Sequence, residues 1–88
     1  MPITESQTLR VKEMLVESLQ MRMEPHEIGD DVSLFGDDGL GFDSVDAIEM
    51  VAGIEQEFGY AFKDESKARE VLGTVRKLTE FLAAEGKL

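Results

Sequence analysis

The stretch "GLGFDSVDAIEMV", residues 39–51, places a serine behind a glycine-rich turn and an aspartate, where a helical pattern begins. Asp43 is a residue type that caps helices, and Asp46 follows three positions later, so a helix is predicted to start after Asp43. Apolar residues then recur at helical spacing as far as Phe58, before "GYAF" interrupts the pattern. Ser44 is therefore predicted to lie in the first turn of this helix.

Three further helices are predicted, over residues 4–21, 64–72 and 74–85, with Thr74 as the cap of the last and Gly86 as its terminator. The side chains expected to face the core are Val11, Met14, Leu15 and Leu19, then Ala68, Val71 and Leu72, and finally Val75, Leu78, Phe81 and Leu82. No stretch gives a convincing strand pattern. The sequence thus predicts an all-α, four-helix bundle of three longer helices and one short helix, forming a single domain over residues 1–88.

The connection between the first two helices, "EPHEIGDDVSLFGDDGLG", is long and rich in glycine, aspartate and proline. Its apolar residues are expected to anchor it to the core: Ile28, Val32, Leu34, Phe35 and Leu40. It therefore reads as a long ordered loop, and loops of this length are usually functional.

The composition disfavours an enzyme. The chain has 88 residues, 42% of them apolar, and carries a formal charge of −10. A chain this short buries one modest core, with little room for a catalytic cleft. It contains no cysteine, no membrane-length apolar run and no secretion-signal pattern in "MPITESQTLR", so we expect a cytoplasmic protein without membrane insertion.

The negative charge is concentrated in the middle of the chain, because no Lys or Arg occurs between Arg22 and Lys63. A negative field of this kind repels nucleic acid and anionic membranes and attracts basic protein surfaces. A role in solubility alone is the competing interpretation.

The helix after Asp43 has two apolar faces. Ala47, Met50, Val51, Ile54 and Phe58 form one face, whereas Val45, Ile48 and Ala52 form a stripe on the other side, flanked by Asp46, Glu49 and Glu55. A small core cannot bury both, so the second stripe is predicted to be a protein-docking surface. The alternative is that the preceding loop folds back over Val45 and Ile48. Gly53 falls on the acidic side of the same helix, where we expect it to permit close approach of a partner backbone.

Other sites in the chain are rejected on their spacing. The acidic loop lacks the glycine and glutamate positions of an EF-hand, and no metal site is predicted. A serine hydrolase needs a base, but His26 is the single histidine and no G-x-S-x-G turn surrounds Ser44. We expect His26 to be a solvated loop residue, and no residue is expected to be catalytic.

Ser44 suits a phosphorylated or phosphodiester-linked serine, because a helix start offers unpaired N–H groups and the positive end of the helix dipole. At this point "LGFDSVDAIEMV" resembles the L-G-x-D-S-[LV] prosthetic-group motif of acyl carrier proteins. The resemblance covers nearly the whole chain, since "RVKEMLVESL" looks like the family's first helix and "VLGTVRKLTEFL" like the stretch entering its last.

The resemblance implies that Ser44 bears 4'-phosphopantetheine, transferred from coenzyme A by a separate magnesium-dependent transferase. The protein would then hold acyl intermediates as thioesters in the lipid metabolism of fatty-acid or polyketide-type biosynthesis. Asp43 and Asp46 match acidic positions that the family presents to the transferase. Val45 stands in place of the usual leucine, Ala52 is smaller than in many members, and the "GDDGLG" loop is slightly longer.

The expected partners are basic surfaces of the transferase and of acyl-processing synthases, reductases and acyltransferases, which a monomer would visit in turn. The docking residues are Asp43, Val45, Asp46, Ile48, Glu49, Ala52 and Glu55. The resemblance also implies an acyl cavity lined by Met50, Val51, Ile54, Phe58, Phe62 and Leu78, although plain core positions explain these residues equally well. A peptidyl carrier domain and an unmodified acidic helical adaptor are the alternative functions.

Overall fold

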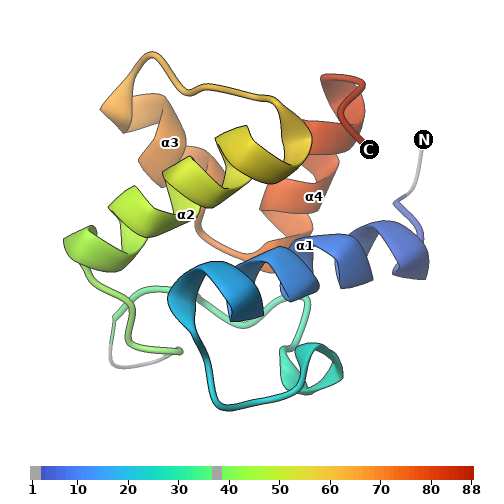
Figure 1. Cartoon of the computed structure of the whole chain (residues 1–88), viewed down its shortest axis with the longest axis vertical. Coiled ribbons are helices and arrows are strands. Elements are labelled where there is room, and N and C mark those ends of the chain that lie inside the picture. The colour runs from blue at the N-terminus through green and yellow to red at the C-terminus, as the bar shows by residue number, and fades with distance from the viewer. Residues whose placement is uncertain (1–2, 37–38) are drawn as a thin grey trace.

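A computed structural model of the protein describes residues 3–36 and 39–88, and within these residues the chain is helical. The elements are α1 (Glu5–Leu19), the short 3-10 helix η1 (Pro25–Glu27), α2 (Ser44–Phe58), α3 (Glu65–Val71) and α4 (Val75–Ala84). Helix α1 packs against α2 and α4, and α3 lies against α4 (Figure 1). The predicted all-α bundle with one short helix is confirmed.

Local capping sets the helix boundaries. Asp43, Asp64 and Thr74 each accept a backbone N–H of the helix that follows, as residues of these types do at N-caps. Helix α2 ends at Gly59, whose φ of 71° is left-handed and favours glycine. The predicted end of α2 at Phe58 is confirmed.

Helix α1 is shorter than predicted at both ends. Thr4 is its cap and forms a reciprocal capping box with Gln7, and the helix stops at Leu19 instead of Met21. Gln20 adopts a left-handed conformation with φ of 50°, and the N–H of Met21 donates to the carbonyl of Val16. The pattern gave no warning of this end, because the position usually holds glycine.

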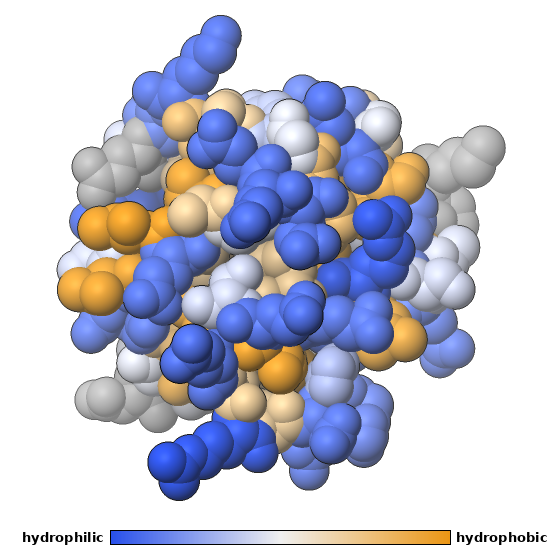
Figure 2. Space-filling view, viewed as in Figure 1, coloured by the Kyte–Doolittle hydropathy of each residue, from blue (hydrophilic) through white to orange (hydrophobic). Residues whose placement is uncertain are grey.

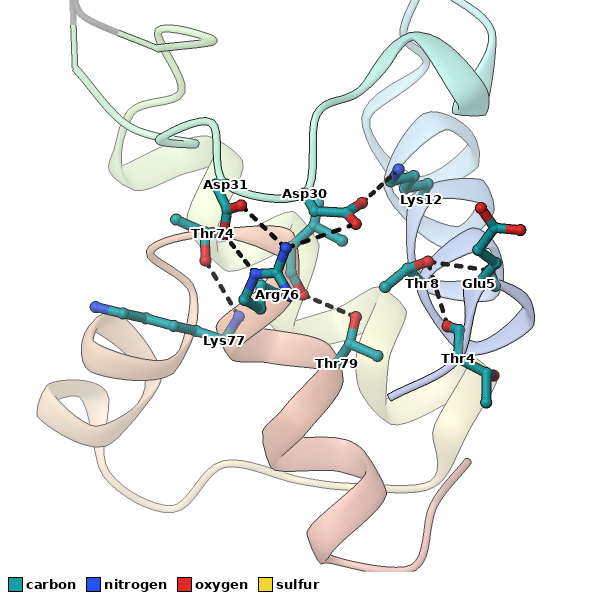
Figure 3. Close-up of polar contacts among 11 residues, drawn as sticks. Thr4, Glu5, Thr8, Lys12, Asp30, Asp31, Thr74, Arg76, Lys77 and Thr79 are labelled. Atoms are coloured by element: carbon teal, nitrogen blue, oxygen red, sulfur yellow. Dashed lines mark hydrogen bonds and ion pairs between the residues drawn. The ribbon is translucent and has the colours of Figure 1, made fainter. Parts of the chain in front are cut away.

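The core lies where the four helices meet and agrees closely with the predicted stripes. The buried apolar residues are Val11, Met14, Leu15, Ile28, Leu34, Met50, Ile54, Phe58, Ala68, Val71, Leu72, Val75, Leu78 and Leu82. Thr79 is also fully buried, and its hydroxyl donates to the carbonyl of Val75 at 2.7 Å (Figure 3). A buried hydroxyl satisfied in this way costs little.

The long loop between α1 and α2 is anchored by apolar side chains, as predicted. Ile28 and Leu34 are buried, and the N–H of Leu34 donates to the carbonyl of Gly73 at 2.9 Å. The prediction for Val32 is wrong, since its side chain is 39% exposed. Val32 packs against the backbone of Gly29 instead of reaching the core. A Cβ built on Gly29 would lie 2.7 Å from Val32 Cγ2.

Charged groups fix the same loop to two helices (Figure 3). Lys12 on α1 pairs with Asp30 at 2.7 Å, and the Arg76 side chain donates to Asp31 Oδ2 at 3.0 Å. The backbone N–H of Arg76 also donates to the Asp30 carbonyl at 2.9 Å. The Arg76 hydrogen bond lowers the pKa of Asp31 below its usual value. These contacts hold the loop between α1 and the start of α4.

Gly53 does not face a partner surface, contrary to the prediction from its position on the helical wheel. It is buried, and a Cβ built on it would overlap Ser18 Oγ and come within 3.0 Å of Met14 Sδ, both on α1. The close approach that Gly53 permits is therefore that of α1. The wheel failed here because it assigns faces within one helix and does not show where the neighbouring helix crosses.

We predict that Gly53→Ala lowers the free energy of unfolding by about 1 kcal/mol, because overpacking costs about 1–3 kcal/mol and better helix propensity returns about 1 kcal/mol. Ala52→Gly, at the exposed neighbouring position, is the matched control and should lose about 1 kcal/mol from propensity alone. Urea denaturation followed by circular dichroism measures both. A more stable Gly53→Ala protein would show that the contact with Ser18 does not exclude a side chain.

Candidate functional site

The start of α2 is closed by a reciprocal capping box. The N–H groups of Val45 and Asp46 donate to Asp43 Oδ1 at 3.0 and 3.1 Å, and the N–H of Asp43 donates to Asp46 Oδ2 at 3.0 Å. The predicted cap at Asp43 is confirmed. The expectation of unpaired N–H groups is wrong for Val45 and Asp46, because the Asp43 carboxylate already uses them. An anion on Ser44 would therefore interact with the helix dipole more than with these donors.

Ser44 is the first residue of α2 and its hydroxyl is available for reaction. The residue is exposed, and in the described part of the chain its hydroxyl makes no hydrogen bond. Because Asp43 supplies the capping oxygen, the helix start does not need the Ser44 side chain. A group attached to the Ser44 hydroxyl oxygen would leave the Asp43 cap intact.

The segment before Asp43 is held by the long loop. Phe42 forms an isolated parallel bridge with Phe35, its N–H donates to the carbonyl of the buried Leu34 at 3.0 Å, and the two rings meet edge to face at 6.3 Å. Gly41 has a φ of 76°, which glycine adopts without strain. These contacts fix the point at which the chain enters α2, and therefore the position of Ser44.

Ser44 lies at the edge of a pocket of about 700 Å³ between α2, the α2–α3 connection and α3. Such a volume falls within the range of small-molecule sites. The pocket is lined by Phe35, Asp43, Ser44, Ala47, Ile48, Val51, Phe62, Lys63, Asp64, Ala68, Arg69 and Leu72. Its lining is mainly apolar. The charged lining residues are Asp43 and Asp64 at the two helix starts, Lys63 before α3 and Arg69 in the last turn of α3. It can shelter an apolar group joined to Ser44.

The structure brings together some of the residues predicted to line an acyl cavity and separates others. Val51 and Phe62 line the pocket. Met50, Ile54, Phe58 and Leu78 lie in the core and do not line it. The sequence reasoning missed the contribution of α3 and its C-cap, because Ala68 and Leu72 were assigned to the core alone. Their inward periodicity was visible, but only the fold shows that they face α2.

The second apolar stripe of α2 is exposed. Val45 is 61% and Ile48 69% exposed, so the loop does not fold back over them, and that alternative is wrong. The other residues of the predicted docking set are Asp43, Glu49, Ala52 and Glu55, which are exposed, and Asp46, which is half-buried. In Figure 2 apolar atoms reach the surface at the left, where α2 begins in Figure 1, with hydrophilic atoms around them. We call these seven residues the docking strip.

Residues 3–36 and 39–88 contain neither a metal cluster nor a membrane span. No group of three or more His, Asp or Glu side chains there could hold a metal ion. No helix in that part of the chain has the length and apolarity needed to span a bilayer.

The chain is similar to known proteins over most of its length. A family model described as "Phosphopantetheine attachment site" matches residues 10–82. Acyl carrier proteins of Bradyrhizobium sp. (strain ORS 278), Nitrobacter hamburgensis and Rhodopseudomonas palustris (strain TIE-1) are each 40% identical to this chain over 78 residues. Each match covers 89% of this chain and 91% of the relative.

We predict that Asp43→Ala lowers the free energy of unfolding by about 1 kcal/mol, because it removes the acceptor of two N–H groups. Asp43→Asn keeps a capping oxygen and is the matched control, with stability expected close to that of the original chain. Urea denaturation of the two variants measures the difference. Equal stability of the Ala and Asn variants would mean that the cap does not hold the start of α2.

Proposed function

Because this chain belongs to the acyl carrier protein family, a family of carriers and not catalysts, we propose that Ser44 is its attachment site for 4'-phosphopantetheine. The domain of this family carries that group covalently. The group supplies a thiol on a flexible arm, to which acyl groups are joined as thioesters. We propose further that the cargo belongs to fatty-acid or polyketide-type synthesis.

The observation that carries this proposal is the position of the Ser44 hydroxyl. It is exposed, it makes no hydrogen bond within the described residues, and it lies at the edge of the apolar pocket. Modification therefore breaks no contact of the fold, and the pocket offers an attached apolar chain a place out of water. The exposed hydroxyl and the neighbouring pocket therefore suit attachment of the prosthetic group at Ser44.

The docking strip supports a role in delivery. Two large apolar side chains, Val45 and Ile48, stand among carboxylates, next to the proposed attachment site. Partners would present an apolar contact surrounded by basic residues, and the long-range attraction between opposite charges would speed their encounter. We propose that the transferase and the acyl-processing enzymes, among them synthases, reductases and acyltransferases, dock on this strip.

We predict that incubation with coenzyme A, magnesium and a broad-specificity phosphopantetheinyl transferase adds one phosphopantetheinyl group, and that Ser44→Ala abolishes the addition. Ser66→Ala is the matched control, because Ser66 is also an exposed serine in the first turn of a helix capped by an aspartate. Intact-protein mass spectrometry measures the addition. The Ser66→Ala variant should be modified fully.

Two results would count against the proposal. Continued modification of Ser44→Ala would move the attachment site to another residue. A folded but unmodified original chain would instead favour an unmodified adaptor that uses only the docking strip. Circular dichroism of each protein before the reaction separates loss of function from loss of fold.

We predict that Ile48→Ala lowers kcat/KM of the transferase for this protein roughly tenfold, since losing about 1.5 kcal/mol of apolar burial has this effect. The exposed side chain contributes little to the core, so the melting temperature should change little. Leu9→Ala, which trims an apolar residue that is 43% exposed on α1, is the control and should leave kcat/KM nearly unchanged. Equal losses in the two variants would contradict docking on α2.

A further inference from the structure

The loop between α1 and α2 supplies part of the cap of α4. Arg76 lies in the first turn of α4, and its N–H donates to the carbonyl of Asp30 at 2.9 Å. The Thr74 hydroxyl accepts the N–H of Lys77 in the same turn at 3.1 Å. Because the first N–H groups of a helix have no partner within it, the loop satisfies a donor that α4 itself cannot satisfy. The loop and the start of α4 therefore stabilise each other.

Four charged side chains reinforce this contact (Figure 3). The Arg76 guanidinium donates to both carboxylate oxygens of Asp31, with an Nη2–Oδ2 distance of 3.0 Å, and lies 4.0 Å from Asp30 Oδ2. The other oxygen of Asp30 pairs with Lys12 of α1 at 2.7 Å. A single surface pair contributes little to stability, but two-point arginine pairs and networks of charges contribute more. We call these four residues the charge network.

The loop connects the charge network to the residues before Ser44. Leu34 is buried, and its N–H donates at 2.9 Å to the carbonyl of Gly73, just before α4. The carbonyl of Leu34 accepts the N–H of Phe42 at 3.0 Å. Asp43, the cap of α2, is the single residue between Phe42 and Ser44. A continuous series of hydrogen bonds thus runs from the start of α4 to the start of α2.

The first turn of α2 depends on this support because core packing begins later in the helix. The first fully buried side chain of α2 is that of Met50, more than one turn after Ser44. Helix ends that lack such packing fray. The Asp43 cap opposes fraying, and its own position is set by Phe42 and the loop.

We propose that Arg76 is a positioning residue for the modification of Ser44, because it holds the loop that fixes where the chain enters α2. This inference rests on the proposed attachment of 4'-phosphopantetheine at Ser44. A looser entry lowers the fraction of molecules that present the Ser44 hydroxyl correctly, and small displacements of a reacting group slow a chemical step strongly. Ile48 and Glu55 of the docking strip lie beyond the first turn, so the loss falls mainly on kcat and not on KM.

The test compares Arg76→Gln with the original full-length chain, using coenzyme A, magnesium and a broad-specificity phosphopantetheinyl transferase. We expect kcat to fall about two- to fivefold with KM nearly unchanged, which is the scale of a lost surface charge network. Hydrogen exchange followed by nuclear magnetic resonance gives a second readout, on the unmodified protein. The N–H groups of Leu34 and Phe42 should exchange faster by a similar factor, whereas the N–H of Leu15 in α1 should not.

Lys77→Gln is the matched control. It removes the neighbouring exposed cation of α4, whose side chain forms no ion pair within residues 3–36 and 39–88. It should change neither kcat nor the exchange rates. Asp31→Ala should lower kcat in the same direction as Arg76→Gln. The double variant should be no slower than Arg76→Gln alone, because both substitutions remove the same contact.

Three results would overturn the role of Arg76. An unchanged kcat in Arg76→Gln would show that Ser44 does not depend on the charge network. A rise in KM alone would assign the network to docking, and equally faster exchange at Leu15 would reduce the effect to overall stability. If Arg76→Gln does not fold, Asp31→Ala decides by the same two measurements, since the Asp31 side chain is 72% exposed.

Failure of the attachment site and failure of the positioning role give different results. Absence of loading of the original chain in the mass spectrum rejects attachment at Ser44, and with it the role of Arg76. Normal loading of the original chain with an unaffected kcat in Arg76→Gln rejects only the role of Arg76 and leaves the carrier function in place.

Discussion

The contact of α1 with α2 at Gly53 governs where the functional residues lie. Without a Cβ at this position, Ser18 and Met14 of α1 come up against the backbone of α2. One side of α2 is thereby committed to the core, and the opposite side, with Val45 and Ile48, must face solvent. Because a helix is a rigid rod, the same contact also fixes its first residue, Ser44. The packing of a core glycine thus helps to place both the docking strip and the proposed attachment site.

The long loop between α1 and α2 leads to Ser44. Buried apolar side chains and ion pairs hold its path. Burying a side chain such as Ile28 or Leu34 contributes about 1.5–3 kcal/mol, whereas ion pairs near the protein surface contribute much less. The energy that orders the loop therefore comes mainly from its two buried anchors. The pairs of Asp30 with Lys12 and of Asp31 with Arg76 select the path between α1 and α4.

Features that depend on neighbours in sequence were predictable, and features that depend on neighbours in space were not. Asp43 and Thr74 cap helices through bonds within three residues, so the starts of α2 and α4 followed from the sequence. The role of Gly53 required the position of α1. The α3 wall of the pocket likewise required the tertiary arrangement. Ser44 was found because its motif is local. Phe62 was named as a cavity residue only through the resemblance, because its contact with Phe81 is made across the fold.

The cap that fixes the start of α2 also bears on how a phosphodiester on Ser44 would be held. The helix dipole favours an anion there by about 0.3–1 kcal/mol. The neighbouring Asp43 carboxylate opposes it by like-charge repulsion. The two effects act in opposite directions, and the N–H groups of Val45 and Asp46 are already occupied. The helix start would therefore orient an arm proposed at Ser44 without binding its phosphate tightly, which would leave such an arm free to move.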